Sequence, residues 1–325
     1  MFSKNNNRIP VGEDWLQPQP MVKWYDLRML SQTAYQVLLS NIFGKYADTR
    51  ETFSRSKFPA PLDYSAIAHS GELWIDYIAD TGDGFNSTYT IASILAKKEW
   101  KIKDEHGTEQ YLQQGNVLVM GGDEVYPAAS YDDYMQRLWL PFECANPAPK
   151  DSSHPLPESA KPQPDLYAIP GNHDGFATGG ETSLEAFVRN FCSPEPVITG
   201  DAHDMVRTAM TQPNVFWTLR APFATIIGLY SNVNEGGTIR QDQEDWFVEE
   251  LAAAPTDAAV LVTIHHPVYS VSSTHAGSER PERKKSMESD TWRRAMKKPS
   301  TDATIMKPTT PILVENVTGP FMPSI

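Results

Sequence analysis

The sequence is poor in cysteine, has no long hydrophobic run and carries too few basic residues to balance its acids. Its two cysteines, Cys144 and Cys192, cannot form a disulfide framework, and neither has a partner at zinc-finger spacing. No stretch reaches the roughly 18 apolar residues of a membrane span, and the N-terminal segment has no apolar core typical of a signal peptide. A cytoplasmic protein without a membrane span is therefore predicted.

The formal net charge of -13 excludes a further group of partners. A surface of this sign repels phosphate at long range, so no nucleic-acid partner and no anionic-membrane surface are predicted. The 325 residues are 40% hydrophobic and 10% aromatic, which suffices for a sizeable core. One large α/β domain or two smaller ones are indicated.

One pattern recurs four times: an apolar, β-type run that stops at charged or turn-forming residues. It is found in "LWIDYIADTGDGF", "NVLVMGGDEVYP", "LYAIPGNHDGF" and "AAVLVTIHHPVY". Ligand sites in open α/β sheets lie beyond the carboxyl ends of strands. We therefore expect the four strand ends to meet at one place.

Helical spacing of apolar residues marks three further segments. Residues 25–48 are predicted to form one amphipathic helix that packs on the body. A second helix should follow the first strand, with Ser87 or Thr88 as its cap and Ile91, Ile94 and Leu95 facing inward. The segment "RQDQEDWFVEELAAAP" predicts a third, which buries Trp246, Phe247 and Leu251 and ends before Pro255. A buried strand is predicted in "PFATIIGLYSN".

The four strand ends carry residue types that bind metals or transfer protons. In chain order they are Asp80 in "DTG", Asp123 and Tyr126 in "GGDEVY", Asn172, His173 and Asp174 in "GNHD", and His265 in "VTIH". This order of motifs resembles that of the calcineurin-like metallophosphoesterase superfamily. The forms of the four motifs are most similar to those of its purple acid phosphatase branch. The resemblance covers roughly Trp74 to Tyr269. It implies a two-sheet α/β/β/α sandwich and metal-dependent hydrolysis of a small-molecule phosphate ester.

The resemblance also implies a centre of two divalent or mixed-valence ions (Fe, Mn or Zn). Asp123 would bridge them, Asn172 and His265 would bind one ion, and Asp80 would bind the other. Tyr126 would be a phenolate ligand, although a half-buried aromatic is the equally open alternative. Two ions about 3.5–4 Å apart lower the pKa of a bound water toward 7, which supplies hydroxide as the nucleophile.

Other polar residues near these motifs are expected to have supporting roles. By resemblance, His173 protonates or stabilises the leaving oxygen, and Asp174 orients it. Asp83 is either a substitute ligand or a residue that stabilises the turn. His266 is expected to shape the turn before Pro267. The "GDAHD" segment at 200–204 and the basic residues Arg280, Arg283 and Lys284 are interpreted as loop and solvated charge.

The chain departs from the family pattern near its end. That pattern closes with GHxH, which gives one histidine to each ion, and no such motif occurs here. We expect a sandwich that is incomplete at the C-terminus, with metal affinity and activity well below those of a complete relative. His203, His275 or Asp83 could partly compensate. The alternative function is a catalytically inactive scaffold or binding protein that keeps the fold.

These observations divide the chain into three parts. Residues 1–70 are expected to form an N-terminal helical extension. Residues 71–279 form the metallophosphoesterase-like domain, with a surface loop at 145–165 that contains six prolines. Residues 280–325 are basic and interrupted by prolines, and they are expected to be a poorly ordered tail in which only "PILVENV" resembles a strand.

Overall fold

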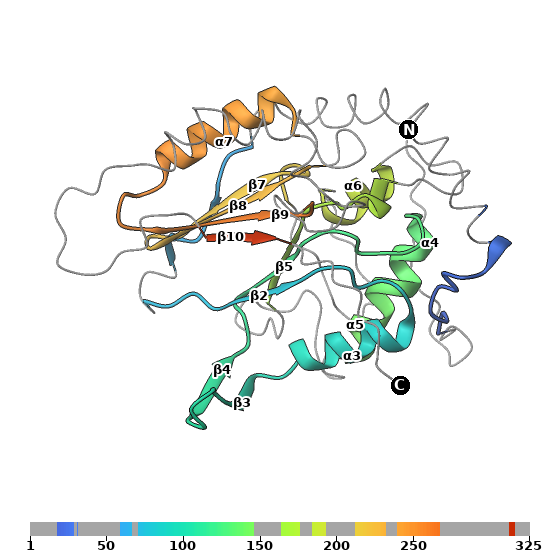
Figure 1. Cartoon of the computed structure of the whole chain (residues 1–325). Coiled ribbons are helices and arrows are strands. Elements are labelled where there is room, and N and C mark those ends of the chain that lie inside the picture. The colour runs from blue at the N-terminus through green and yellow to red at the C-terminus, as the bar shows by residue number, and fades with distance from the viewer. Residues whose placement is uncertain are drawn as a thin grey trace, which may run out of the picture.

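The computed structural model describes residues 18–28, 31, 59–66, 71–145, 164–175, 184–192, 212–231, 239–266 and 312–315. Two main sheets occupy the centre of the molecule (Figure 1). The smaller sheet is parallel and has the order β2 (Ile75–Ile78), β5 (Val117–Met120), β6 (Asp165–Ala168). The larger has the order β1 (Leu62–Asp63), β7 (Trp217–Arg220), β8 (Ala224–Leu229), β9 (Ala259–Ile264), β10 (Ile312–Glu315). Only the β7–β8 pair within it is antiparallel.

Strand alternation explains why the two sheets stack. Successive side chains of a strand point to opposite faces, so odd and even positions enter different cores. Residues from both sheets share the core between them: Val117, Val119, Tyr167, Ile169, Trp217, Leu219 and Ile226. Their neighbours Leu118, Met120, Leu166 and Ala168 belong instead to a second core that includes helical residues. Both faces of the smaller sheet are therefore buried, as expected for parallel strands.

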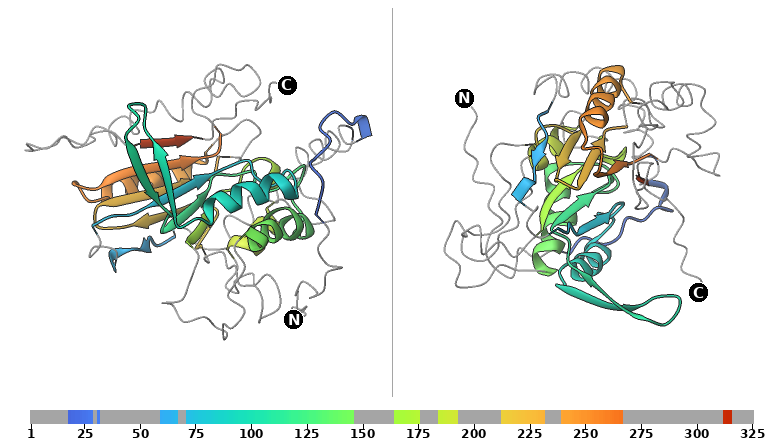
Figure 2. Two further views of the ribbon diagram at one scale, coloured as in Figure 1. Left: turned by 90° about the horizontal axis from the view of Figure 1, so that it is seen from below. Right: turned by 90° about the vertical axis from the view of Figure 1, so that its left-hand side faces the viewer.

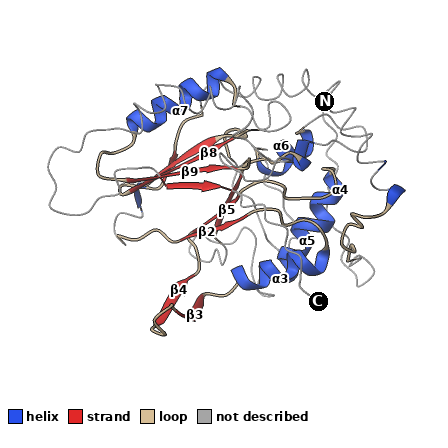
Figure 3. Cartoon of the chain, viewed as in Figure 1, coloured by secondary structure: helices blue, strands red, loops and turns tan. Residues whose placement is uncertain are grey.

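Helices cover the outer faces of this pair of sheets. Figure 2 shows α7 (Gln241–Ala253) beyond the larger sheet, and α3 (Phe85–Leu95) with α5 (Leu140–Ala145) on the opposite side. Figure 3 shows the same order by element type. Further turns are formed by α4 (Tyr131–Asp133), the π-helical η4 (Tyr134–Trp139), the 3-10 turn η6 (His173–Gly175) and α6 (Glu185–Phe191). The predicted α/β/β/α sandwich is confirmed.

Several predicted elements lie where the sequence placed them. The four apolar runs form β2, β5, β6 and β9, and "PFATIIGLYSN" contains β8. Helix α7 buries Trp246, Phe247 and Leu251 and is followed by Ala254, directly before Pro255. Trp246 packs on Phe216 with ring centroids 4.8 Å apart, which fixes α7 against the larger sheet.

Helix α3 packs Leu95 against the core as predicted, but its buried residues differ from the prediction. Its N-cap is Gly84, and neither Ser87 nor Thr88 caps it. Thr88 and Ala92 are its buried residues, whereas Ile91 and Ile94 are 37% and 43% exposed. Thr88 also donates from its hydroxyl to the carbonyl of Thr81 at 2.9 Å. The small side chains allow α3 to approach α5 closely, so the prediction that Ile91 and Ile94 face inward was wrong.

Some elements were not predicted, and some predictions fall on residues that the structure does not describe. The hairpin of β3 (Glu99–Lys103) and β4 (Glu109–Gln113) was not predicted. Strand β10 pairs with β9, so residues 312–315 of the expected tail belong to the larger sheet. Most of the predicted 25–48 helix, the 145–165 loop and the rest of the tail lie outside the described residues. Within the described part of the chain, no helix has the length and apolar character needed to cross a membrane.

Candidate metal centre

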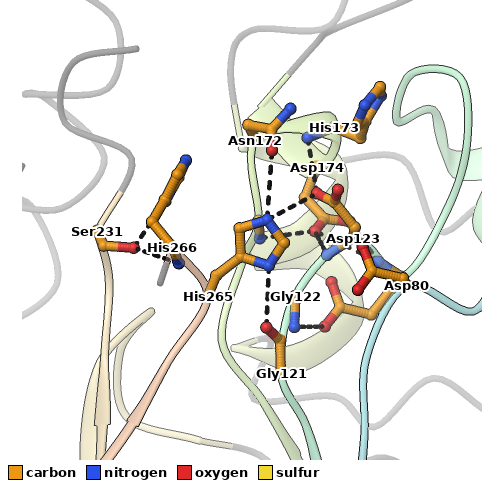
Figure 4. Close-up of polar contacts among 12 residues, drawn as sticks. Asp80, Gly121, Gly122, Asp123, Asn172, His173, Asp174, Ser231, His265 and His266 are labelled. Atoms are coloured by element: carbon orange, nitrogen blue, oxygen red, sulfur yellow. Dashed lines mark hydrogen bonds and ion pairs between the residues drawn. The ribbon is translucent and has the colours of Figure 1, made fainter. Parts of the chain in front are cut away.

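The four strand ends meet at one place, as the sequence predicted. Asp80 follows β2, Asp123 follows β5 and Asn172 follows β6, whereas His265 follows β9 of the larger sheet. Figure 4 shows His265 reaching across toward Asp123 and Asn172. The site therefore takes side chains from both sheets.

The loops after β2 and β5 have the same unusual backbone conformation. Asp80 and Asp123 both have a φ of 55°, in the left-handed region that non-glycine residues rarely adopt. The two loops are joined by hydrogen bonds, because the Asp80 N–H donates to the Gly122 carbonyl at 3.0 Å and the Thr81 N–H donates to the Asp123 carbonyl at 3.2 Å. This backbone pairing fixes the positions of the two carboxylates, and strain of this kind is typical of functional sites.

A first group of three oxygen donors, the tyrosine trio, consists of Asp80, Tyr126 and Asp123. The Tyr126 hydroxyl donates to Asp80 Oδ1 at 2.6 Å and lies 3.0 Å from Asp123 Oδ2. Its side chain is nearly buried, at 9% exposure. Burial, followed by the charges of Asp123 and Asp80, raises the pKa of Tyr126 far above its ordinary value.

A second group, the histidine trio, consists of Asp123, Asn172 and His265. The His265 Nε2 lies 3.2 Å from Asn172 Oδ1 and 3.5 Å from Asp123 Oδ1. The other ring nitrogen, Nδ1, lies 3.0 Å from the carbonyl oxygen of Gly121. Because a carbonyl can only accept, Nδ1 carries the hydrogen and Nε2 of the neutral ring presents a lone pair. That lone pair faces two acceptor oxygens, an arrangement that a cation or a proton would stabilise.

The spacing of both trios fits metal coordination. Ligand atoms about 2.1 Å from one ion lie roughly 3.0–3.4 Å apart at octahedral or tetrahedral angles. The contacts of 3.0 and 3.2 Å lie within this range and the 3.5 Å contact lies just beyond it, whereas the 2.6 Å contact is a hydrogen bond and is therefore shorter. Asp123 directs one carboxylate oxygen to each trio. Among the described residues, no three His, Cys, Asp or Glu side chains are placed so that they alone could hold a metal ion, so each trio needs Tyr126 or Asn172 to reach three donors.

The position of Gly171 allows Asp123 to reach the site. A Cβ at this residue would lie 2.1 Å from Asp123 Oδ1 and 2.5 Å from its backbone nitrogen. Any side chain here would displace the carboxylate that both trios share. The glycine in "GNHD" is therefore required by a close approach.

His173 lies beside the tyrosine trio. Its ring centroid is 4.5 Å from that of Tyr126, and its Nδ1 is 2.7 Å from the carbonyl oxygen of Pro127. Its backbone N–H donates to Asp123 Oδ1 at 2.9 Å. The ring is partly exposed, which leaves it accessible from solvent.

Asp174 does not orient the His173 ring, so this expectation was wrong. Its carboxylate is buried and accepts from the backbone N–H groups of Asp123 and Gly171, both at 2.8 Å, and from the Tyr134 hydroxyl at 2.7 Å. A longer contact at 3.3 Å joins it to the Glu124 N–H. Asp174 therefore holds the two loops that carry the donors, and the Pro127 carbonyl takes the orienting position at His173.

A buried acid next to Asp174 was not predicted from the sequence. Glu124 is 1% exposed, and its Oε1 accepts from the Gly122 N–H at 3.2 Å. Burial and the neighbouring Asp174 charge raise the pKa of Glu124 well above its ordinary value. Burial raises the pKa of Asp174 as well, so two buried acids lie next to each other beneath the site, and the Glu124 N–H lies 3.3 and 3.4 Å from the two Asp174 oxygens. A glutamate within "GDEVY" resembles a solvent-exposed loop residue, so its burial could not be predicted.

The other candidate residues have different partners. Asp83 Oδ1 accepts from the Trp24 indole N–H at 3.0 Å and so holds an N-terminal residue. The ring of the buried His266 bonds to the Ser231 hydroxyl at 2.9 Å. Both cysteines are free thiols, with Cys192 buried. His203, the remainder of segment 200–204, His275, Arg280, Arg283 and Lys284 lie outside the described residues.

Comparison with known protein families gives a match. A family model described as calcineurin-like phosphoesterase matches residues 73–304, which is well over half of the chain and includes all four strand ends. No curated protein matches the chain.

Proposed function

Because the chain belongs to the calcineurin-like phosphoesterase family, we propose that its two donor trios bind two metal ions and that it hydrolyses small-molecule phosphate esters. The observation that supports this most directly is the position of the Asp123 carboxylate. One of its oxygens lies in each trio, as a bridging ligand requires. Iron, manganese and zinc all suit a site with carboxylate, amide, phenol and imidazole donors.

Neighbouring groups set the tautomer of His265 and the protonation of Tyr126. Metal ions bound here would act as Lewis acids toward a phosphoryl oxygen and would lower the pKa of a bound water. The Gly121 carbonyl accepts from Nδ1 of His265 and so fixes the tautomer in which Nε2 faces the oxygens of Asn172 and Asp123. Tyr126 is protonated without metal, because two carboxylates and burial raise its pKa. Binding of a metal therefore requires Tyr126 to lose its proton, which makes the affinity pH-dependent.

His173 is the residue that we assign to the leaving group. Its Nδ1 donates to the Pro127 carbonyl, so Nε2 is the ring atom that gives or takes a proton. The ring packs on Tyr126 and is therefore next to the tyrosine trio. Loss of this group should lower kcat more than it raises KM, because proton transfer contributes about 10²–10⁴-fold to rates.

The absence of GHxH sets the expected strength of the site. Each trio supplies three protein donors, and no imidazole besides that of His265 is added by a GHxH motif. Three donors can hold a metal, but with less support than four. We expect weak metal affinity and slow hydrolysis that rises with added metal.

The test combines metal content with hydrolysis of two ester types. Purified protein is incubated with manganese or iron, desalted and analysed for metal per chain, and a phosphate monoester and a diester are assayed in parallel. We expect up to about two ions per chain and hydrolysis of at least one ester. Asp123→Asn should lose both, and Asp257→Asn, the same change in an exposed turn, should keep both. A folded wild-type protein without metal and without hydrolysis would instead indicate a scaffold.

A further inference from the structure

An N-terminal strap, residues 18–26, lies against the loop between β2 and α3. The Val22 N–H donates to the Asp83 carbonyl at 3.1 Å, and the Phe85 N–H donates to the Gln19 carbonyl at 2.9 Å. Arg137 donates from the same guanidinium nitrogen to the carbonyls of Pro20 and Asp83 at 3.3 and 2.9 Å. These bonds attach a segment that precedes the matched family domain to the loop that carries Asp80.

Trp24 is the strap residue that reaches the candidate metal centre. Its indole N–H donates to Asp83 Oδ1 at 3.0 Å. Its ring centroid lies 5.5 Å from that of Tyr126 and 5.9 Å from that of His173, with an interplanar angle of 81° in both cases. Trp24 therefore contacts a residue of the tyrosine trio and the residue assigned to the leaving group.

Exposure indicates from which side a substrate can approach. Asp123, Tyr126 and His265 are buried, whereas Trp24, Asn172 and His173 are partly exposed. The accessible side of the site is thus bordered by His173 and Trp24. A leaving oxygen next to His173 would have its organic group directed toward the indole.

We propose that Trp24 binds the organic group of the substrate, and that the chain prefers phosphoesters of aromatic alcohols. This rests on the proposed function in so far as the phosphoryl group occupies the two trios. An indole held in place by a hydrogen bond offers a planar ring at low entropic cost, and aromatic pairs contribute more than burial of area alone. A net charge of -13 disfavours a leaving group with further anionic charge.

Binding of two phosphonates tests the preference without requiring turnover. Phenylphosphonate and methylphosphonate are titrated calorimetrically into metal-loaded protein. We expect the phenyl compound to bind about fivefold to tenfold more tightly, the effect of one aromatic contact. Trp24→Ala should abolish this ratio and Trp24→Phe should keep most of it. Tyr25→Ala is the matched control, because Tyr25 is the adjacent aromatic residue and is 89% exposed.

The outcomes separate this inference from the proposed function. Equal affinity of the wild-type protein for both phosphonates, or binding of neither, overturns the inference. A Trp24→Ala variant that weakens both phosphonates by the same factor also overturns it, since the strap would then be only structural. A retained phenyl preference in a protein that hydrolyses no ester refutes the hydrolase and leaves the aromatic subsite standing. Hydrolysis without any phenyl preference refutes the subsite alone.

Discussion

Replacement of Asp174 by asparagine should destabilise the fold even in the absence of metal. The carboxylate accepts three short hydrogen bonds, from the N–H groups of Asp123 and Gly171 at 2.8 Å and from the Tyr134 hydroxyl at 2.7 Å. An asparagine can keep its oxygen toward the two backbone donors only by turning its amide nitrogen toward Tyr134. The geometry is then retained, but the negative charge that strengthens each bond is lost.

The size of the effect follows from the number of these bonds. Hydrogen bonds to a charged group contribute about 1.5–3 kcal/mol and neutral ones about 0.5–1.5 kcal/mol, so each bond loses roughly 1 kcal/mol. Three short bonds give an expected decrease of about 3 kcal/mol in the free energy of unfolding. Urea denaturation of the metal-free protein in EDTA measures this value without a contribution from metal binding.

A matched variant and a clear contrary result complete the experiment. Asp257→Asn makes the same change in an exposed turn and should alter the free energy of unfolding by less than about 0.5 kcal/mol. A decrease below about 1 kcal/mol for Asp174→Asn would contradict the reasoning. It would mean that Asp174 is itself protonated in the folded protein, since asparagine closely mimics a protonated aspartate.

Three further predictions concern the site and the core beside it. Gly171→Ala places a Cβ 2.1 Å from Asp123 Oδ1 and should displace this carboxylate. Titration with metal should then show at least a tenfold loss of metal affinity. Unchanged metal affinity would mean that Asp123 is not a ligand. In metal-free protein, Tyr126 should lose its proton only well above the pH at which an ordinary tyrosine does, because burial and the charges of Asp123 and Asp80 raise its pKa. Ferric loading should give a visible charge-transfer band that Tyr126→Phe removes, and a band that persists would exclude the phenolate. Burial raises the pKa of Tyr167 from 10.0 to about 12, so the unfolded chain loses this proton first and the free energy of unfolding should fall between those pH values. Tyr64, Tyr126 and Tyr134 also have pKa values raised by burial and add to this fall. Tyr167→Phe should therefore make the slope less steep by the share of one proton, and an unchanged slope would contradict the raised pKa of Tyr167.

The convergence of the four strand ends was predictable, because it depends on a rule about parallel strands. Apolar runs that stop at Asp80, Asp123, Asn172 and His265 place these side chains at one edge of the sheets. The rule does not predict which hydrogen-bond partners each of these side chains takes. The sequence contains no sign that Asp174 would accept from backbone N–H groups of two loops and leave His173 to the Pro127 carbonyl.

The buried face of helix α3 and the contacts of the strap were not predicted, for a different physical reason. Hydrophobicity favoured Ile91 and Ile94 as core residues, but the approach of α5 selects the face with Thr88 and Ala92. Local pattern describes one element at a time, whereas burial is decided by the partner element. Trp24 illustrates the same point, because its contacts with Tyr126 and His173 bridge about 100 residues or more of sequence.

The division of donors between two sheets means that the smaller sheet alone can form the tyrosine trio, whereas the histidine trio needs both sheets. Asp80, Asp123 and Asn172 follow strands of the smaller sheet, and His265 follows a strand of the larger one. The core that contains Tyr167 and Trp217 holds the two sheets together. An ion bound in the histidine trio would link Asp123 and Asn172 of the smaller sheet to His265 of the larger sheet. Two complementary fragments, cut between β6 and β7, should each lack that ion and recover it only when they recombine.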